Sequence, residues 1–117
     1  MNIKSIIPHR EPIIMIDKII MHNEAQTVTS LTILEDNIFL EDNIFQSSGL
    51  IEHIAQSSAA RMGLIKYNEG KPPLIGYIAS IKNLKINRMP YVGDVVQTKI
   101  IVKNQIGNII IVTGESI

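Results

Sequence analysis

Two stretches near the start of the chain have the pattern of hydrophobic and polar positions that is typical of β-strands. Residues 13–23, IIMIDKIIMHN, are rich in β-branched residues and almost continuously apolar, as in a strand that is buried on much of both faces. Residues 26–34, QTVTSLTIL, alternate more clearly between the two kinds of residue. Because the residues between them, NEA, can form a tight turn, this pattern predicts a β-hairpin.

The pattern becomes helical at Ser47 or Ser48. From there the segment SGLIEHIAQSSAARMGLIKYNEG begins with residues that favour an N-cap, continues with good helix formers and ends at Gly70. It predicts a helix of about five turns, which the two prolines at residues 72 and 73 end. Apolar residues are spread over more than one stripe of this helix, so we expect it to be buried on several sides.

The rest of the chain has the pattern of further strands, which we expect at residues 74–86, 95–104 and 108–117. The segment RMPYVGD, residues 88–94, predicts a turn, and a hairpin turn is expected near Gly107. One long apolar helix among long antiparallel strands predicts an α+β fold in which the sheet wraps the helix. No linker or low-complexity segment divides the sequence, so we expect residues 1–117 to form a single domain.

The composition fits a chain that has a real core and does not enter a membrane. Hydrophobic residues make up 45% of the 117 residues, and no apolar run approaches the roughly 20 residues that span a bilayer. Pro8 interrupts the N-terminal residues before a signal-peptide core of about 7 residues develops, so export is not expected. The chain has no cysteine, which excludes disulfides, thiolate nucleophiles and cysteine-based zinc sites and fits a cytoplasmic location.

Charge is balanced overall and uneven along the chain. Eleven basic and eleven acidic residues give a formal net charge of zero, so the composition does not support a nucleic-acid partner. Between Glu35 and Glu52 the charged residues are all acidic, whereas between residues 82 and 103 five basic residues accompany one acidic residue. These basic residues either form the solvent faces of strands, which is the more common case, or make this end of the chain attractive to anions.

Glu52 is the first candidate for chemistry. It is expected in the first turn of a largely buried helix, where an ionised carboxylate is costly unless it is paired, hydrogen-bonded or reached by water. The simpler and more common interpretation is a first-turn glutamate that favours the helix dipole. Gln56 lies one turn further on and could hydrogen-bond in the same region. His53 points roughly 100° around the helix, so His53 and Glu52 are not a ready acid–base pair within one chain.

The other histidines suggest neither a metal nor a cofactor. His9 lies between two prolines in a rigid turn, where a histidine is more often a structural hydrogen-bond donor than a base. His22 ends a strand and is expected to be solvated. The sequence contains no His-x-x-x-His pair, no Gly-rich phosphate loop and no Gly-x-Ser-x-Gly motif. We therefore expect no metal and no cofactor.

Three blocks of sequence resemble the hot-dog-fold 3-hydroxyacyl-[acyl-carrier-protein] dehydratases. Residues 7–19, IPHREPIIMIDKI, resemble the opening of that family, Pro-His-Arg-x-Pro followed by apolar residues and an aspartate. Residues 49–56, GLIEHIAQ, resemble its helix motif, a glutamate followed by two residues and Ala-Gln. Residues 91–94, YVGD, preceded by Arg88, resemble its Pro-Gly-Asp turn. The blocks occur in the family's order with compatible spacing and cover nearly the whole chain.

The resemblance implies a hot-dog fold, with an antiparallel sheet wrapped around one long central helix, and a dimer with an acyl tunnel at its interface. In this family a histidine removes the proton at C2, an acidic residue from the partner's helix helps the hydroxyl leave, and helix N-terminal amides polarise the thioester carbonyl. Glu52 matches the acidic position, Gly49 the glycine at the helix start and Gln56 the glutamine of the motif. The implied partners are an acyl carrier protein, an acyl thioester substrate and a second hot-dog subunit, identical or different.

The loop before the helix departs from the family's pattern. Active members carry their catalytic histidine there in a Gly-His-Phe-Pro motif, whereas this chain has LEDNIFLEDNIFQSSG, a hexapeptide written twice and without histidine. We expect its Asp-Asn pairs to form turns and its Ile-Phe pairs to line the tunnel mouth, with Phe45 as a substrate contact. The small dehydratase-like proteins of aryl-polyene and flexirubin-type pigment synthesis also lack the motif and are more similar. Family members usually carry one more strand after the equivalent of residues 108–117, so either the sheet is one strand shorter here or the sequence stops before that strand.

The sequence leaves three functions open. The first is a dehydratase of fatty-acid or polyene biosynthesis, with Glu52 as the acid and His53, the only local candidate, as the base. The second is a catalytically weak or inactive hot-dog subunit that binds acyl chains or completes a dimer whose partner supplies the histidine. The third is an acyl thioesterase. Acyl carrier proteins are acidic, and the family's carrier-facing surface would contain Lys82, Lys85 and Arg88.

Overall fold

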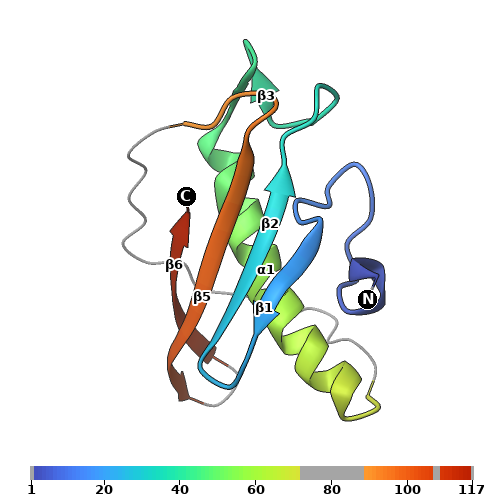
Figure 1. The fold of residues 1–117 in the computed structure, drawn as a ribbon, viewed down its shortest axis with the longest axis vertical. Coiled ribbons are helices and arrows are strands. Elements are labelled where there is room, and N and C mark those ends of the chain that lie inside the picture. Colours follow the sequence, from blue (N-terminus) through green and yellow to red (C-terminus); the bar gives the residue numbers. More distant parts are fainter. Residues whose placement is uncertain (1, 72–88, 107–108, 117) are drawn as a thin grey trace.

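The computed structural model describes residues 2–71, 89–106 and 109–116 of the chain (Figure 1). The elements, in chain order, are a 3₁₀ helix at Ile3–Ser5, β1 (Lys18–His22), β2 (Gln26–Thr32), β3 (Leu40–Glu41), β4 (Ile44–Phe45), α1 (Ser47–Asn68), β5 (Val95–Ile106) and β6 (Ile109–Ser116). One long helix combined with antiparallel strands confirms the α+β class expected from the sequence.

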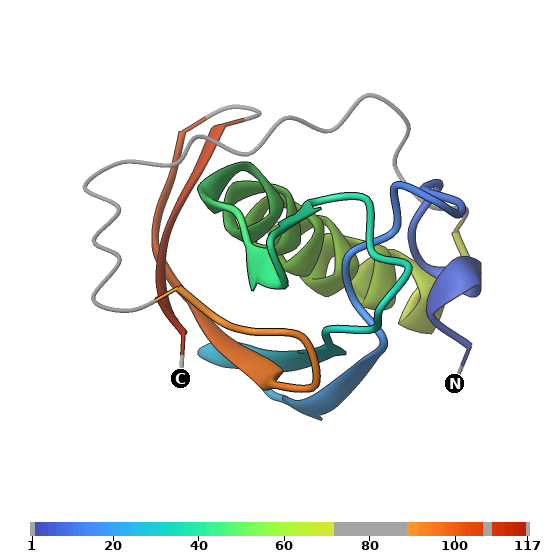
Figure 2. The ribbon, with the colours of Figure 1, turned by 90° about the horizontal axis from the view of Figure 1, so that it is seen from above.

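Strands β1, β2, β5 and β6 form one antiparallel sheet in the order β1-β2-β5-β6. The pairing of β2 with β5 is regular along the whole of β2. The two outer pairings each contain an irregularity, between Ile19 and Met21 in β1 and between Val102 and Asn104 in β5. Because such irregularities bend a strand and increase its local twist, they favour the curvature seen in Figure 2, where the sheet folds around α1.

The N-terminal hairpin expected from the sequence is confirmed, but β1 begins at Lys18 and not at Ile13. The apolar residues before β1 take no part in the sheet because side chains of α1 bind their backbone groups. The amide of Met15 donates to Oε1 of Gln56, and the carbonyl of Met15 accepts from a ring nitrogen of His53. A continuous apolar run therefore reads like a strand in sequence and forms a helix-bound loop in the structure.

The C-terminal hairpin is also confirmed, since β5 pairs with β6 in antiparallel fashion and continues to Ile106 rather than ending at Asn104. The strand expected at residues 74–86 lies outside the described residues. In the described part of the expected turn, Gly93 has a φ of 92° and donates its amide to the carbonyl of Ile33. This turn therefore fastens the start of β5 to the end of β2.

Helix α1 is 22 residues long and has buried residues on several sides, as expected. The chain enters the helix directly from β4, with Gln46 as the N-cap residue, and the amides of Gly49 and Leu50 donate to the carbonyl of Gln46. The helix begins at Ser47, as expected, but the first-turn position expected for Glu52 was wrong, because counting from Ser47 places Glu52 in the second turn. No acidic residue lies in the first turn, so a simple pairing of Glu52 with the end of the helix dipole loses support.

Helix α1 packs against the rest of the chain through two apolar clusters and a polar layer. One cluster gathers around the start of α1 and contains Met15, Leu31, Ile33, Phe45, Leu50 and Val96. The other lies between α1 and the N-terminal residues and contains Ile3, Ile6, Ile7, Ile16 and Ala60. In the polar layer, side chains of α1 hydrogen-bond side chains of β2 and β5, in the pairs His53–Thr98, Ser57–Thr29 and Arg61–Thr27. Such pairing removes most of the cost of burying polar groups.

The two copies of LEDNIF have different structures. The second copy, residues 40–45, forms the β3–β4 hairpin, in which Asp42 and Asn43 have φ values of 52° and 63°. Positive φ at both central positions is the pattern of a type I′ turn. The first copy, residues 34–39, forms a loop in which Oδ1 of Asn37 accepts from the amide of Phe39. Both Asp-Asn pairs therefore lie in turns, as expected, but the turns are of different kinds.

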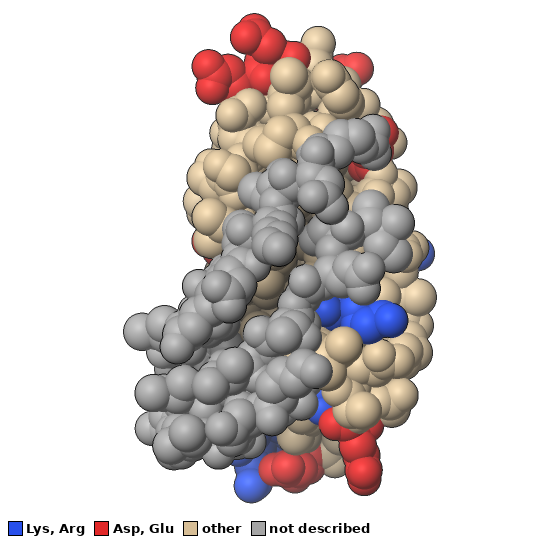
Figure 3. Space-filling view, turned by 90° about the vertical axis from the view of Figure 1, so that its left-hand side faces the viewer, with Lys and Arg blue, Asp and Glu red and all other residues tan. Residues whose placement is uncertain are grey.

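Acidic side chains gather at the end of the molecule that carries β3 and β4 (Figure 3). The exposed acidic residues of that segment are Glu35, Asp36, Glu41 and Asp42. A concentration of one sign of charge repels a partner of the same sign. Among the described residues, no helix is both long enough and apolar enough to cross a lipid bilayer.

Candidate active site

Glu52 is held by Gln56, one turn further along α1. Nε2 of Gln56 donates to Oε1 of Glu52 at 2.7 Å and to the carbonyl of Ile13 at 2.9 Å, while Oε1 of Gln56 accepts from the amide of Met15 at 2.6 Å. Gln56 is fully buried, whereas 33% of the Glu52 side chain is exposed. The buried amide of Gln56 therefore fixes the carboxylate of Glu52 on one side, and the rest of the Glu52 side chain remains partly accessible.

His9 lies beside Glu52, a proximity that the sequence does not indicate. Nε2 of His9 is 4.0 Å from Oε1 of Glu52, and 28% of the His9 side chain is exposed. The loop that carries His9 is held by Arg10, whose guanidinium group donates to the carbonyls of Lys4, Ile7 and His9 itself. In the Pro-His-Arg block, the arginine thus fixes the backbone and the histidine lies near the helix carboxylate.

The two ring nitrogens of His53 are already engaged in the interior. Nδ1 lies 2.7 Å from the carbonyl of Met15 and Nε2 lies 2.8 Å from Oγ1 of Thr98, with the side chain fully buried. Burial lowers the pKa of His53, although the hydrogen bond to Met15 and the negative charge of Asp17 act in the opposite direction. The base role expected for His53 is therefore corrected to a structural one in this arrangement, since neither nitrogen is open to a substrate.

Gly49 and Phe45, expected as substrate contacts, pack against each other. A Cβ atom on Gly49 would come within 2.6 Å of the Phe45 ring and 2.7 Å of Cβ of Phe39. Phe45 is fully buried, and the ring of Phe39 meets it edge-on at a centroid distance of 6.4 Å. The amide of Gly49 is used inside the helix, where it donates to the carbonyl of Gln46 at 3.0 Å. Phe45 and Phe39 therefore pack against the start of α1 at Gly49.

Two further expectations concern a carrier protein and metal ions. The proposed docking residues Lys82, Lys85 and Arg88 lie outside the described residues. Among the residues that the structure does describe, no group of three or more histidine, aspartate or glutamate side chains is arranged to hold a metal ion.

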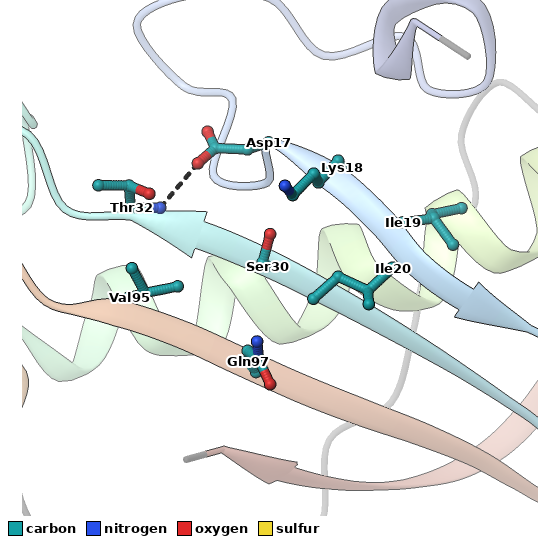
Figure 4. Close-up of a pocket in the computed structure, with 8 residues that line it drawn as sticks. All are labelled: Asp17, Lys18, Ile19, Ile20, Ser30, Thr32, Val95 and Gln97. Carbon is teal, nitrogen blue, oxygen red and sulfur yellow. Dashed lines mark hydrogen bonds between the residues drawn. The ribbon is translucent and has the colours of Figure 1, made fainter.

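A pocket of about 590 Å³ lies on the opposite face of the sheet from α1 (Figure 4). It is lined by residues of β1, β2, β5 and the residue before β1, namely Asp17, Lys18, Ile19, Ile20, Ser30, Thr32, Val95 and Gln97. Its one carboxylate accepts a hydrogen bond from the amide of Thr32 at 2.7 Å. The lining contains neither Glu52 nor a histidine, so we place the candidate active site at the Glu52–His9 pair and not in this pocket.

The polar layer behind the site was not expected from the sequence. Arg61 is buried, and its guanidinium group donates to Oγ1 of Thr27 at 2.8 Å and to the carbonyl of Asn23 at 3.0 Å. Burial lowers the pKa of Arg61, and its hydrogen bonds fasten the β1–β2 turn to α1. The signal was present in the sequence, because His53, Ser57 and Arg61 recur every four residues and so share one helix face.

A curved antiparallel sheet around a single long helix, with a carboxylate and a histidine at its edge, defines a hot-dog domain of the dehydratase type. The fold is similar to a solved structure described as the dehydratase heterocomplex ApeI:P from Xenorhabdus doucetiae, with a TM-score of 0.83. That match covers 99% of this chain and 88% of the other, at 15% sequence identity. At this identity the likeness shows the shared fold.

Sequence comparison gives the family. The family model described as ApeP-like, ApeP dehydratase, matches residues 1–107, and the chain belongs to this family. Two proteins named 3-hydroxyacyl-[acyl-carrier-protein] dehydratase FabZ are also similar. The protein from Oceanobacillus iheyensis is 32% identical over 99 residues, which are 80% of this chain and 69% of the relative. The protein from Rhizobium leguminosarum bv. trifolii is 31% identical over 114 residues, or 92% and 72% of the two chains. The resemblance found in three short blocks is thus confirmed.

Proposed function

We propose that this chain removes water from a 3-hydroxyacyl thioester bound to an acyl carrier protein, in the synthesis of a polyene-type acyl chain. The observation that carries the proposal is the 4.0 Å separation between Nε2 of His9 and Oε1 of Glu52, at a partly exposed site backed by Gln56. Membership of a dehydratase family supports the reaction class. A carboxyl group and an imidazole are one acid and one base, which is what an elimination requires.

The elimination needs one proton removed at C2 and one delivered to the oxygen at C3. Neutral His9 takes the C2 proton on Nε2, and the electron pair left behind forms the C2–C3 double bond. The C3–O bond breaks as protonated Glu52 gives its proton to the departing hydroxyl, which leaves as water. Because Gln56 binds Oε1 of Glu52, Oε2 is the oxygen assigned to carry the proton that is given to the hydroxyl. Afterwards the proton on His9 returns to Glu52 through one bridging water, and the pair is ready again.

A second hot-dog subunit completes the site in this proposal. Ile13, whose carbonyl binds Gln56, and Ile51, next to Glu52, each leave 43% of their surface exposed. Apolar surface beside an acid–base pair suits a covering subunit and an acyl chain between the two. The solved structure with the similar fold is described as a heterocomplex of dehydratases, and by analogy the partner is either a second copy of this chain or a different hot-dog chain.

The second candidate function is a subunit whose partner supplies the catalytic histidine. Two observations favour it. The duplicated segment before α1 contains no histidine, and 4.0 Å is too long for a direct hydrogen bond between His9 and Glu52. In this version Glu52 remains the acid, and the chain by itself has little activity.

The test measures the conjugated enoyl product formed from a 3-hydroxyacyl thioester, for the chain alone and mixed with a candidate partner subunit. Glu52→Gln should lower kcat by about 10²- to 10⁴-fold wherever activity is found, because the acid is lost. If His9 is the base, His9→Gln causes a comparable loss. If only the mixture is active and His9→Gln leaves it unchanged, the partner supplies the base. The control is Glu69→Gln, an exposed carboxylate at the end of α1. Full activity in Glu52→Gln would falsify both versions.

We further propose that the carrier protein docks on the basic segment that contains Lys82, Lys85 and Arg88. The acidic end that carries β3 and β4 repels an acidic carrier, whereas the basic segment carries charges of the opposite sign. Lys85→Glu should weaken carrier binding more at low salt than at high salt, since salt screens exposed charges. Lys18→Glu, on the outer face of the sheet, is the matched charge reversal and should have little effect. We also propose a cytoplasmic location, because a chain without cysteine is compatible with that reducing compartment.

A further inference from the structure

A chain of hydrogen bonds runs from the sheet to the catalytic carboxylate. Oγ1 of Thr98 on β5 bonds Nε2 of His53, and Nδ1 of His53 bonds the carbonyl of Met15. The amide of Met15 donates to Gln56, and Gln56 donates to Glu52. The distances are 2.8, 2.7, 2.6 and 2.7 Å in this order. Residues of β5, of α1 and of the loop before β1 are therefore tied to the position of one carboxylate.

The direction of each bond follows from the chemistry of its atoms. A carbonyl oxygen can only accept, so Nδ1 of His53 carries the proton that it donates to Met15. In the neutral ring Nε2 is then an acceptor, and the hydroxyl group of Thr98 donates to it. This tautomer is fixed by its two partners, and the fully buried ring meets no competing water.

His53 is placed to affect the positions of both Glu52 and His9, the two members of the acid–base pair. Met15 follows the Pro-His-Arg loop in the chain, so the bond to its carbonyl fastens the segment that leads from His9 to β1. The same residue supplies the amide that orients Gln56, which in turn orients Glu52. The two backbone groups of Met15 make no strand pairing, so the side chains of α1 are what bind them.

We propose that His53 is a positioning residue for the elimination. Its hydrogen bond to the carbonyl of Met15 holds Gln56, Glu52 and the His9 loop in their relative positions. The proposal rests on the proposed function for its kinetic consequence, whereas its geometric consequence is independent of activity. His53 neither accepts nor donates a proton in the reaction. Its bond to Met15 carries the effect, and its bond to Thr98 fixes the ring that makes that bond.

Two conservative substitutions separate the bonds. In His53→Asn the side-chain amide nitrogen takes the place of Nδ1 and can still donate to Met15, while the bond to Thr98 is lost. In His53→Gln the side-chain amide reaches the position of Nε2 and keeps a bond to Thr98, while the bond to Met15 is lost. We expect His53→Gln to lower kcat by about 10- to 100-fold with little change in KM, because a shift of about 1 Å at the reacting groups costs this much. His53→Asn should retain most of kcat.

The pH profile and a control pair distinguish positioning from other roles. His53→Asn and His53→Gln should both keep the wild-type shape of the pH profile of kcat, because neither substitution changes a group that titrates in the reaction. The matching variants His22→Asn and His22→Gln change a histidine at the end of β1 that takes no part in the chain of bonds, and they should not differ in kcat. Equal losses in His53→Asn and His53→Gln, or no loss in either, would overturn the proposal.

Hydrogen exchange gives a readout that needs no activity. The Met15 amide and the side-chain amide of Gln56 should be protected in the wild-type chain and in His53→Asn, and should exchange faster in His53→Gln, as measured by NMR on the full chain. If the wild-type chain and its mixtures show no dehydratase activity, the proposed function fails while this exchange pattern still tests the positioning of Glu52. Uniform protection in all three proteins would remove the link from His53 to Gln56.

Discussion

Gly49 of α1 lies so close to Phe45 of β4 that a Cβ atom at position 49 would come within 2.6 Å of the phenyl ring. The helix can start directly after the β3–β4 hairpin only because this side chain is absent. The contact also fixes where the first turns of α1 lie, and Glu52 follows within one turn of the helix. A single glycine thus helps to fix where Glu52 lies relative to the buried aromatic residues.

Gly49→Ala should lower the free energy of unfolding by about 1–3 kcal/mol, because the added methyl group overpacks the contact with Phe45 and Phe39. The sign of this change in the free energy of unfolding is informative, because in an unconstrained helix alanine is more favourable than glycine by about 1 kcal/mol. Urea unfolding followed by circular dichroism measures the change. Ser48→Ala, at an exposed neighbouring position, should stay within about 0.5 kcal/mol of the wild type. A more stable Gly49→Ala chain would contradict the close packing.

Gln56→Glu should lower kcat by about 10²-fold while the chain remains folded. The substitution keeps the shape of the side chain and an acceptor for the amide of Met15, but removes the donor that holds Oε1 of Glu52. Two carboxylates at hydrogen-bond distance cannot both ionise readily, so one of them takes up a proton and the pH dependence of kcat should change shape. The measurement is kcat against pH, with Gln97→Glu on the outer face of the sheet as control. An unchanged kcat in Gln56→Glu would show that the bond to Glu52 is dispensable.

The stability of the chain should fall as the pH drops below about 6.5. Burial lowers the pKa of His53 from its ordinary value of 6.5, so the unfolded chain binds a proton that the folded chain does not. Stability is therefore fully present above the unfolded pKa and is lost on acidification, with a slope of at most about 1.4 kcal/mol per pH unit for one proton. Burial also lowers the pKa of His22, with a smaller effect from the charge of Arg61, so His22 contributes with the same sign.

Urea unfolding at a pH of about 8 and of about 5.5 measures this dependence. His53→Asn should reduce it, because the ionisable ring is gone and the neutral contact to Met15 remains. A pH dependence that is the same in both chains would show that His53 titrates alike in the folded and unfolded states.

Asn43→Gly should stabilise the chain, and Asn37→Gly should destabilise it, although both asparagines occupy the same place in the repeated hexapeptide. Asn43 has a φ of 63° at the second central position of a type I′ turn, where glycine is preferred. Asn37 accepts a hydrogen bond from the amide of Phe39, which glycine cannot replace. We expect changes of about 0.5–1 kcal/mol in opposite directions, measured as shifts of the urea midpoint. Changes of equal sign would mean that the two copies have the same local structure.

Much of the fold could be predicted from local patterns. The period of the apolar residues indicated the hairpin of β1 and β2, the long helix and the pairing of β5 with β6, because each pattern reflects which face of an element is buried. The family followed from short motifs around His9 and Glu52. The boundary of β1 did not follow, because the apolar run before Lys18 is consistent with a strand until the side chains of α1 bind Met15.

The candidate site likewise contains residues that the sequence indicated and residues that only the structure identified. The sequence indicated Glu52 and Gln56 because four residues along a helix bring two side chains together. It assigned the base to His53, which is adjacent to Glu52 in the chain, and gave His9 a structural role, whereas the structure brings His9 to Glu52 and buries His53. No local pattern relates residue 9 to residue 52, since their approach depends on how the N-terminal loop packs on the helix.

The sequence by itself determined the alternation of strands and helix, the family motifs and the amino acids available for acid–base chemistry, all of which depend on neighbours along the chain. Only the tertiary structure decided which histidine meets Glu52 and how each LEDNIF copy folds. Identical residues 34–39 and 40–45 have the same local preferences, but Phe45 is fully buried against Gly49 while Phe39 is half-buried beside it. The second copy is therefore held as a hairpin and the first as a loop, because burial against distant residues outweighs a preference that both copies share.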